Sequence, residues 1–211
     1  MSQPAIDVSD CAIVCFEMQR GVVGDLASMP VIKDAIDESG VIGEISRLMQ
    51  PCRDAGIPVL HMTAARRADG RGGYANMPYI TQHLARTKDS PAANSLVLGN
   101  PGVDVVPELS APDDIVLVRL HGVSGFHDTG LDTMLRSLGK RTIILVGSSV
   151  NRGIAGTAIE GINHGYTIVI PREAVCGYPL DYRDQMLEHS LKAIAHIPSV
   201  DEVLALLGES A

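Results

Sequence analysis

The chain has 211 residues, which is enough for one domain with a sizeable hydrophobic core. A net charge of −8, an isoelectric point near 5.3 and only 3% aromatic residues argue against nucleic-acid and anionic-membrane partners. The first ten residues lack the basic and apolar regions of a signal peptide, and no uncharged run reaches the roughly 18 residues of a membrane span. We therefore expect a single cytoplasmic domain over residues 1–211.

Apolar runs alternate with helical patterns along the chain. In chain order they predict a strand at residues 12–17, a helix over 31–55 with a break near Gly40, strands at 57–62 and 114–119, a helix over 131–138, a strand at 142–147, a helix over 153–164, a strand at 166–170, a helix over 180–196 and a last helix after residue 199. Val/Ile/Leu-rich strands separated by helices are typical of parallel sheets covered on both faces. The pattern predicts an α/β protein with a three-layer αβα, doubly wound, mostly parallel sheet.

Local signals mark two helix starts and one long connection. Thr129 with Asp132, and Ser199 with Glu202, have the spacing of a capping box, although the first carries Asp in place of Glu or Gln. Residues 64–100 are long and irregular. Such a segment in a compact domain is expected to be a lid, a binding loop or an oligomer contact.

The polar residues of the chain gather after predicted strands. Glu17 ends the first strand, Arg119 ends the third, and residues 148–153 turn from the fourth strand directly into a helix. Ligands of doubly wound sheets bind beyond the carboxyl ends of the strands, where a helix N-terminus also presents backbone N–H groups. Many hydrolases place Ser or Cys at this turn, but here the helix opens with Gly153. The sequence thus predicts an active-site geometry without the usual attacking atom.

Other nucleophiles stay open as alternatives. Ser148 or Ser149 is a candidate if His121 reaches it from the loop after the third strand, and Ser149 is otherwise expected to be a binding hydroxyl. The four cysteines show no CxxC spacing, and three of them lie in apolar stretches. They are expected to be buried free thiols, Cys15 included.

Four segments together resemble the isochorismatase-like hydrolase superfamily, which has the cysteine hydrolase fold. They are Ile13 to Gln19, Gly56 to His61, Val116 to Arg119 with Ser124 to Phe126, and Gly147 to Gly153. The resemblance extends from about residue 10 to residue 208. It implies an isochorismatase-like, Rossmann-like fold, hydrolysis without a nicotinamide or flavin cofactor, and assembly into homodimers or homotetramers.

Most members of that superfamily carry an Asp–Lys–Cys triad. The resemblance places Glu17 at the Asp position, Arg119 (or Leu120 in an ungapped alignment) at the Lys position and Gly153 at the Cys position. The isochorismatase branch is similar in carrying Gly there, and its Asp acts as a general acid on a vinyl ether. Nicotinamidase-like members hold a metal near the second strand. The segment after His61 lacks the matching Asp and His, so no metal is expected.

The resemblance suggests roles for the two charged residues. Glu17 is the candidate general acid or base, although its side chain is one methylene longer than Asp. Arg119 cannot shuttle a proton, so it is expected either to clamp a carboxylate of the substrate or to pair with Glu17. The candidate substrate-binding residues are Gln19, Arg66, Arg67, His121, Ser149, Asn151, Arg152 and Gly153.

The leading hypothesis is a cofactor-independent hydrolase of a small substrate that bears a carboxylate or carbonyl group. It would act by acid/base chemistry through Glu17 rather than by a Cys nucleophile. One alternative is a catalytically silent relative that binds a small ligand or a partner subunit. Another is a lyase or isomerase on the same scaffold.

Overall fold

The computed structural model describes residues 7–73, 76–88 and 94–209. Its longer elements, in chain order, are β1 (Cys11–Phe16), α1 (Pro30–Ser39), α2 (Val41–Asp54), β2 (Val59–Ala64), α3 (Pro78–Thr87), β3 (Ile115–Arg119), α4 (Leu131–Ser137), β4 (Thr142–Ser148), α5 (Gly153–Asn163), β5 (Thr167–Val169), β6 (Val175–Cys176), α6 (Leu180–His189) and α7 (Val200–Glu209). Residues 1–6 lie outside these ranges. They belong to the N-terminal segment that was predicted to lack a signal peptide.

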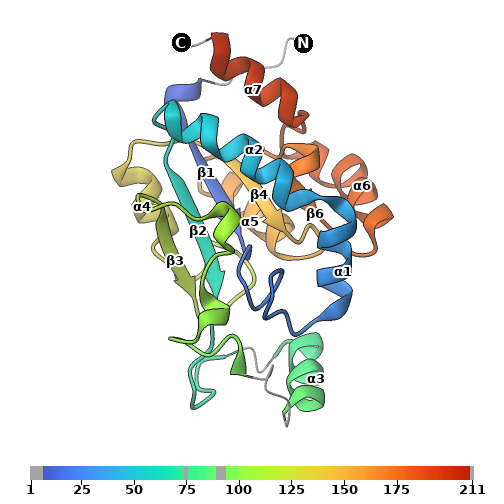
Figure 1. The fold of residues 1–211 in the computed structure, drawn as a ribbon. Helices are drawn as coiled ribbons and strands as arrows, with labels where there is room; N and C mark the ends of the chain where they lie inside the picture. The colour runs from blue at the N-terminus through green and yellow to red at the C-terminus, as the bar shows by residue number, and fades with distance from the viewer. Residues whose placement is uncertain (1–6, 74–75, 89–93, 210–211) are drawn as a thin grey trace.

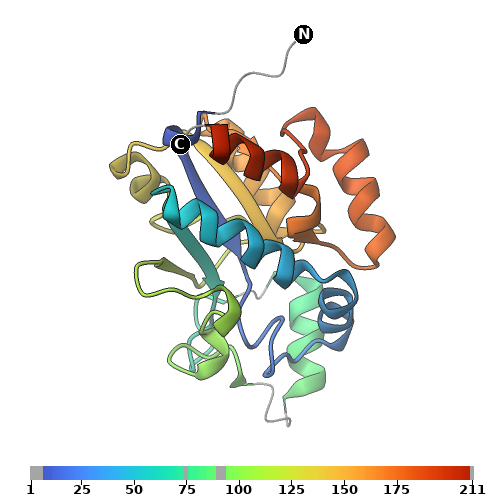
Figure 2. The same ribbon diagram turned by 45° about the horizontal axis from the view of Figure 1, so that its top comes forward.

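The strands form one parallel sheet in the order β3-β2-β1-β4-β5, with β6 paired to β4. The central strand β1 is buried on both faces because its side chains alternate between two cores. Cys11, Ile13 and Cys15 pack with the helices α1, α2 and α7, whereas Ala12, Val14 and Phe16 pack with α4, α5 and α6. This is the predicted three-layer arrangement, and in Figures 1 and 2 helix α2 crosses the front of the sheet.

Helix α3 lies inside the segment 64–100, which the sequence analysis treated as irregular. Figure 1 places it beyond the carboxyl ends of the strands, at the opposite end of the molecule from α7. The rest of the segment is held by a short bridge in which Arg66 exchanges backbone hydrogen bonds with Leu96 and Leu98, both 2.9 Å long. Residues 74–75 and 89–93 of the segment fall outside the described part of the chain.

Most predicted boundaries lie within one residue of the structure, but those of two elements differ by two residues or more. Strand β2 begins at Val59 rather than at residue 57, because the N–H of Ile57 closes helix α2 by donating to the carbonyl of Cys52 at 2.9 Å. The helix predicted over 180–196 ends at His189. The chain then bends so that the N–H of His196 donates to Ile168, which extends the edge of β5.

The two capping boxes have different outcomes. At α7, Ser199 and Glu202 exchange side-chain to backbone hydrogen bonds of 2.6 and 3.1 Å, as predicted. At α4, the hydroxyl of Thr129 accepts from the N–H of Leu131 at 3.2 Å, but Asp132 does not complete a box. Its carboxylate instead contacts residues on α4 and at the start of β5.

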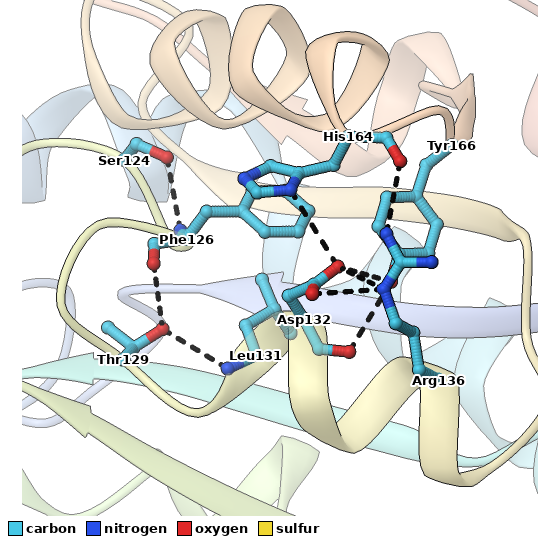
Figure 3. Close-up of polar contacts among 8 residues, drawn as sticks. All are labelled: Ser124, Phe126, Thr129, Leu131, Asp132, Arg136, His164 and Tyr166. Carbon is cyan, nitrogen blue, oxygen red and sulfur yellow. Dashed lines mark hydrogen bonds and ion pairs between the residues drawn. The ribbon is translucent and has the colours of Figure 1, made fainter.

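Figure 3 shows the network that Asp132 forms. Its carboxylate accepts from Arg136 at 3.0 Å and from the hydroxyl of Tyr166 at 2.9 Å, while Arg136 also donates to the backbone carbonyl of His164 at 3.2 Å. Burial, reinforced by this hydrogen bond to Asp132, raises the pKa of Tyr166 to about 12. The network ties α4 to the end of α5 and to β5.

Candidate active site

A cavity of about 260 Å³ lies beyond the carboxyl ends of β1, β3 and β4. Glu17, Arg119 and Gly153, which are distant in the sequence, all line it. Glu17 directly follows the central strand and has a φ of 53°, a left-handed conformation that is uncommon for a residue with a side chain. The location agrees with the general rule that doubly wound sheets bind ligands at this edge.

Glu17 and Arg119 form a direct ion pair. The Nη2 of Arg119 donates to the Oε1 of Glu17, and its Nη1 donates to the backbone carbonyl of Gly122. The Arg119 side chain is only 4% exposed, and its guanidinium carbon lies 5.2 Å from the centre of the Phe16 ring. The Glu17 side chain keeps 24% of its surface exposed. Of the two roles expected for Arg119, the geometry therefore favours holding Glu17.

Gly153 is the first residue of α5, and Phe16 packs against it. A Cβ at this position would meet the Cε1 of Phe16 and would lie 2.7 Å from its Cδ1 and 2.9 Å from its Cζ. Real Cβ atoms do not approach other carbons this closely, so the aromatic ring occupies the volume that a side chain would need. The glycine therefore allows close approach of Phe16, not only of a ligand.

The turn between β4 and α5 directs backbone donors toward the cavity. Its peptide bond between Ser148 and Ser149 is cis, and both serines line the cavity. The N–H groups of Arg152 and Ile154 are used within the turn, since both donate to the carbonyl of Ser149. Across the described part of the chain, the N–H groups of Ser149 and Gly153 donate to no protein acceptor. They are thus placed to receive an oxygen from a ligand.

Arg152 lines the cavity between two tyrosine rings. Its guanidinium carbon lies 4.5 Å from the ring centre of Tyr79 on α3 and 5.3 Å from that of Tyr178, whose hydroxyl accepts one of its hydrogen bonds. Asn151 turns away to the backbone of Tyr178, with hydrogen bonds of 2.6 and 3.0 Å. Asn151 therefore stabilises the loop before α6 and does not reach the cavity, unlike its predicted role in substrate binding.

Gln19 is also structural. Its side chain is fully buried, donates to the carbonyls of Ala64 and Gly102 at 2.8 and 3.2 Å, and accepts from the N–H of Ala64 at 2.6 Å. Every polar atom of the amide is thereby engaged by backbone groups. Gln19 joins the end of β2 to the segment near residue 102 and does not line the cavity.

The remaining predicted binding residues divide between the cavity and the surface. Arg66 lines the cavity and donates to Asn94 at 3.2 Å. Arg67 lies outside it, where it forms an exposed ion pair with Asp69 at 2.8 Å. His121 lies outside the lining as well, with its ring 5.5 Å from that of His127.

The apolar side of the cavity was not predicted from the sequence. Its residues come from the beginning of α1, from α3 and from the segment that follows α3, namely Met29, Ile32, Ile80, Leu84 and Leu96. The spacing of Ile80 and Leu84 is helical, and this was the available signal for both α3 and the wall.

His61 takes part in a buried polar cluster away from the cavity. Its Nε2 lies 2.9 Å from the carboxylate of Asp114, which also accepts two hydrogen bonds from Arg53 at 2.7 and 3.0 Å. Burial lowers the pKa of His61, although Asp114 acts in the opposite direction. Within the described residues, no group of three His, Cys, Asp or Glu side chains is arranged to hold a metal ion.

A family model and several known proteins match the chain. Residues 11–202 match the family model for the isochorismatase domain. The chain is 26% identical over 202 residues to the uncharacterized isochorismatase family protein YecD of Escherichia coli O157:H7, covering 96% of this chain and 98% of the relative. It is 24% identical to the ureidoacrylate amidohydrolase RutB of Rhizobium rhizogenes, covering 96% and 85% of the two chains.

The fold is likewise that of solved structures. A cysteine hydrolase from Pseudomonas syringae pv. phaseolicola superposes with a TM-score of 0.79 at 23% identity, over the whole of both chains. An isochorismatase family protein from Burkholderia thailandensis superposes with a TM-score of 0.76 at 24% identity, over 98% of this chain and all of the other. No helix in the described ranges is both long and apolar enough to cross a membrane.

Proposed function

Because the chain belongs to the isochorismatase family of hydrolases, we propose that it hydrolyses a small carbonyl- or carboxylate-bearing substrate by acid/base chemistry through Glu17. No cofactor and no covalent thiol take part. The observation that carries the proposal is the Glu17–Arg119 pair, which opens onto the cavity beside the free N–H groups of Ser149 and Gly153. The ring of Phe16 fills the volume that a side chain at position 153 would need.

Each group has a defined part in the proposed reaction. Arg119 holds one oxygen of Glu17, which leaves the other to exchange a proton at the exposed side of the carboxylate. With a carbonyl substrate, Glu17 takes a proton from water while the water oxygen adds to the carbonyl carbon. The oxygen that gains negative charge is received by the N–H groups of Ser149 and Gly153, and the proton then passes to the leaving group.

A vinyl ether would use the same residues in another order. This route begins from protonated Glu17, whereas the ion pair with Arg119 uses its carboxylate, so the observed pair supports the carbonyl route first. With the proton in place, Glu17 would give it to the enol carbon, and water would trap the resulting oxocarbenium ion. Glu17 recovers a proton from that water as the bond between carbon and oxygen forms. No residue at position 153 is needed in either route.

The first prediction concerns Glu17→Gln. Wild-type protein and the variant should be assayed against isochorismate and against a panel of small amides, imides, lactones and esters. Loss of a general acid/base group reduces turnover by about 10²- to 10⁴-fold, so we expect a reduction of this size on any substrate that the wild type hydrolyses. Glu160→Gln, on the outer part of α5, is the matched control and should keep full activity. Unchanged activity of Glu17→Gln would remove the proposed mechanism.

One observation also favours a catalytically silent relative. The guanidinium that holds Glu17 is itself anchored to the backbone of Gly122, so the pair is fixed without a ligand. In that case neither the wild type nor Glu17→Gln turns over any compound of the substrate panel, yet a ligand still raises the melting temperature of the wild type. A lyase or isomerase would convert a substrate without consuming water, which labelling with ¹⁸O-water would reveal.

We also propose a cytoplasmic location and assembly into a homodimer or homotetramer. Helix α5 exposes Ile159 and Ile162, which are apolar side chains suited to a subunit contact. Light scattering of the purified protein measures its mass directly, and a monomer at every concentration would contradict the assembly.

A further inference from the structure

We infer that the substrate has a compact hydrocarbon body attached to its carbonyl group, and that this body lies against helix α3. Only the position of the substrate's carbonyl group rests on the proposed function. The position of its hydrocarbon body follows from the apolar lining of the cavity, and its binding is measured without turnover.

The cavity has two chemically different sides. Glu17, Arg119 and the N–H groups of residues 149 and 153 lie at the strand ends. The opposite side is mostly apolar, and α1, α3 and the segment after α3 supply its apolar residues Met29, Ile32, Ile80, Leu84 and Leu96. The same parts of the chain also bring the polar residues Ser28, Thr81, His83 and Ser95 to the lining. A substrate that reaches the polar groups with its carbonyl therefore brings the rest of its body against hydrocarbon.

The apolar face of helix α3 is turned to the cavity. Ile80 and Leu84 are four residues apart and share one face of the helix, and that face lines the cavity. None of the α3 side chains is fully buried in the protein. In contrast, the apolar faces of α2 and α5 are buried against the sheet. An apolar body in the cavity would give α3 the burial that the protein does not supply.

Two contacts join α3 to the polar end of the cavity and to the segment before α1. Tyr79 packs on the guanidinium of Arg152, the residue directly before Gly153, at 4.5 Å. His83 lies 3.3 Å from the hydroxyl of Ser28, just before α1. The helix is therefore a wall of the binding site, and the wall limits how long the hydrocarbon body is.

The test measures binding to the Glu17→Gln protein, so that no probe is consumed. Isothermal titration with acetamide, butanamide, hexanamide and cyclohexanecarboxamide provides a series of growing hydrocarbon size, and N-carbamoylglycine provides a polar comparison. Burying a methylene group strengthens binding by about fourfold, so we expect Kd to fall by about this factor per methylene until the cavity is filled. N-carbamoylglycine should bind no better than acetamide. A flat series, or tighter binding of the polar probe, would overturn the inference.

Matched variants on α3 locate the effect. Leu84→Gln places an amide on the wall, and Ala85→Gln places one on the exposed side of the same helix. Leu84→Gln should raise the Kd of hexanamide by about tenfold and leave the Kd of acetamide unchanged, because only the longer probe reaches the wall. Ala85→Gln should change neither. Equal effects of the two variants would also overturn the inference.

The binding series and the turnover assays of the wild type together separate this inference from the proposed function. A rising affinity along the series with no turnover by the wild type would retain the apolar subsite and remove the hydrolase. Turnover confined to polar substrates, with a flat binding series, would retain the hydrolase and remove the apolar subsite.

Discussion

Phe16 and Gly153 form a packed pair in which one side chain takes the space of another. Phe16 is fully buried, and its ring lies between the Cα of Gly153 and the guanidinium of Arg119. The ring thus contacts two residues that line the cavity. Glycine at position 153 leaves the space that the Phe16 ring occupies.

Gly153→Ala should destabilise the protein. A methyl group at this position overlaps the ring of Phe16, and overpacking of this kind costs about 1–3 kcal/mol. Gly156→Ala on the same helix is the control, since its Cβ would meet nothing closer than 3.8 Å. It should be neutral or stabilise the helix by up to about 1 kcal/mol. Urea unfolding of the two variants gives both values, and equal free energies of unfolding would contradict the packing argument.

A double-mutant cycle assigns the cost to Phe16. In a Phe16→Leu background the smaller side chain leaves room, so the penalty of Gly153→Ala should fall to less than about half. An unchanged penalty would place the strain elsewhere in the turn.

The strand pattern predicted the positions of Glu17 and Arg119 better than those of the amides Gln19 and Asn151. Glu17 and Arg119 end parallel strands, and parallel strands bring their carboxyl ends to one edge, so the meeting of these residues follows from the strand pattern. Gln19 and Asn151 also stand near strand ends, but their partners are backbone groups 27 to 83 residues away. Backbone partners carry no signature in the sequence, and both amides were therefore assigned to the substrate.

At the scale of elements, one buried polar cluster joins α2, β2 and the start of β3. Arg53 comes from α2, His61 from β2, and Asp114 from the residue before β3. Burial raises the pKa of Asp114, but hydrogen bonds from Arg53 and His61 outweigh this and lower the pKa overall. The carboxylate therefore remains ionised across the neutral range and links the three elements.

The cluster should make stability depend on pH through His61. Its pKa is lowered in the folded protein, mainly by burial, so the unfolded chain binds a proton more readily. Stability should therefore fall as the pH drops below about 6.5 toward the lowered value. The lowered pKa of Asp114 acts only at more acidic pH. The melting temperature of the wild type should decrease between about pH 7.5 and pH 5.5.

His61→Gln removes this titration. Its melting temperature should change less over the same pH range, whereas the exposed His189→Gln should follow the wild type. A variant at position 61 that keeps the full pH dependence would show that another group is responsible.

Helix α3 shows why one element was missed. Ile80 and Leu84 carry the spacing of an amphipathic helix, but the pattern is short and stands between glycine-rich and polar stretches. The helix also has no sheet beneath it, because its apolar face lines a cavity. The sheet helices α2 and α5 were predicted since their longer patterns match a buried surface.

At the scale of the whole molecule, all four thiols are buried in the native fold. Cys11, Cys15, Cys52 and Cys176 are each at most 2% exposed. Burial raises the pKa of Cys11 to about 11 and that of Cys52 to about 12, and it raises the pKa of Cys15 and Cys176 as well. None is therefore a reactive thiolate at neutral pH.

Iodoacetamide should leave the native protein unmodified and its activity unchanged. In denaturant the same reagent should label four sites, which mass spectrometry counts. Ser137→Cys places a thiol on the exposed end of α4 and should be labelled in the native state. Native alkylation that abolishes activity would restore a cysteine mechanism and contradict the proposed function.

The architecture as a whole was predictable because it depends on patterns that every strand repeats. The parallel sheet and the alternation with helices follow from apolar runs along the entire chain. The short strand β6 was not predicted, since two residues are too few to form a pattern. The parallel sheet is specified by patterns that run through many residues, whereas the ion pair of the site depends on only two.

The contact between Phe16 and Gly153 has an evolutionary consequence. A lineage that acquired cysteine at position 153 in one step would pass through a destabilised protein in which the new thiol competes with an aromatic ring. A prior exchange of Phe16 for a smaller residue would remove this overlap. The two positions are therefore expected to be epistatic, so that the order in which they change decides whether each intermediate protein stays stable.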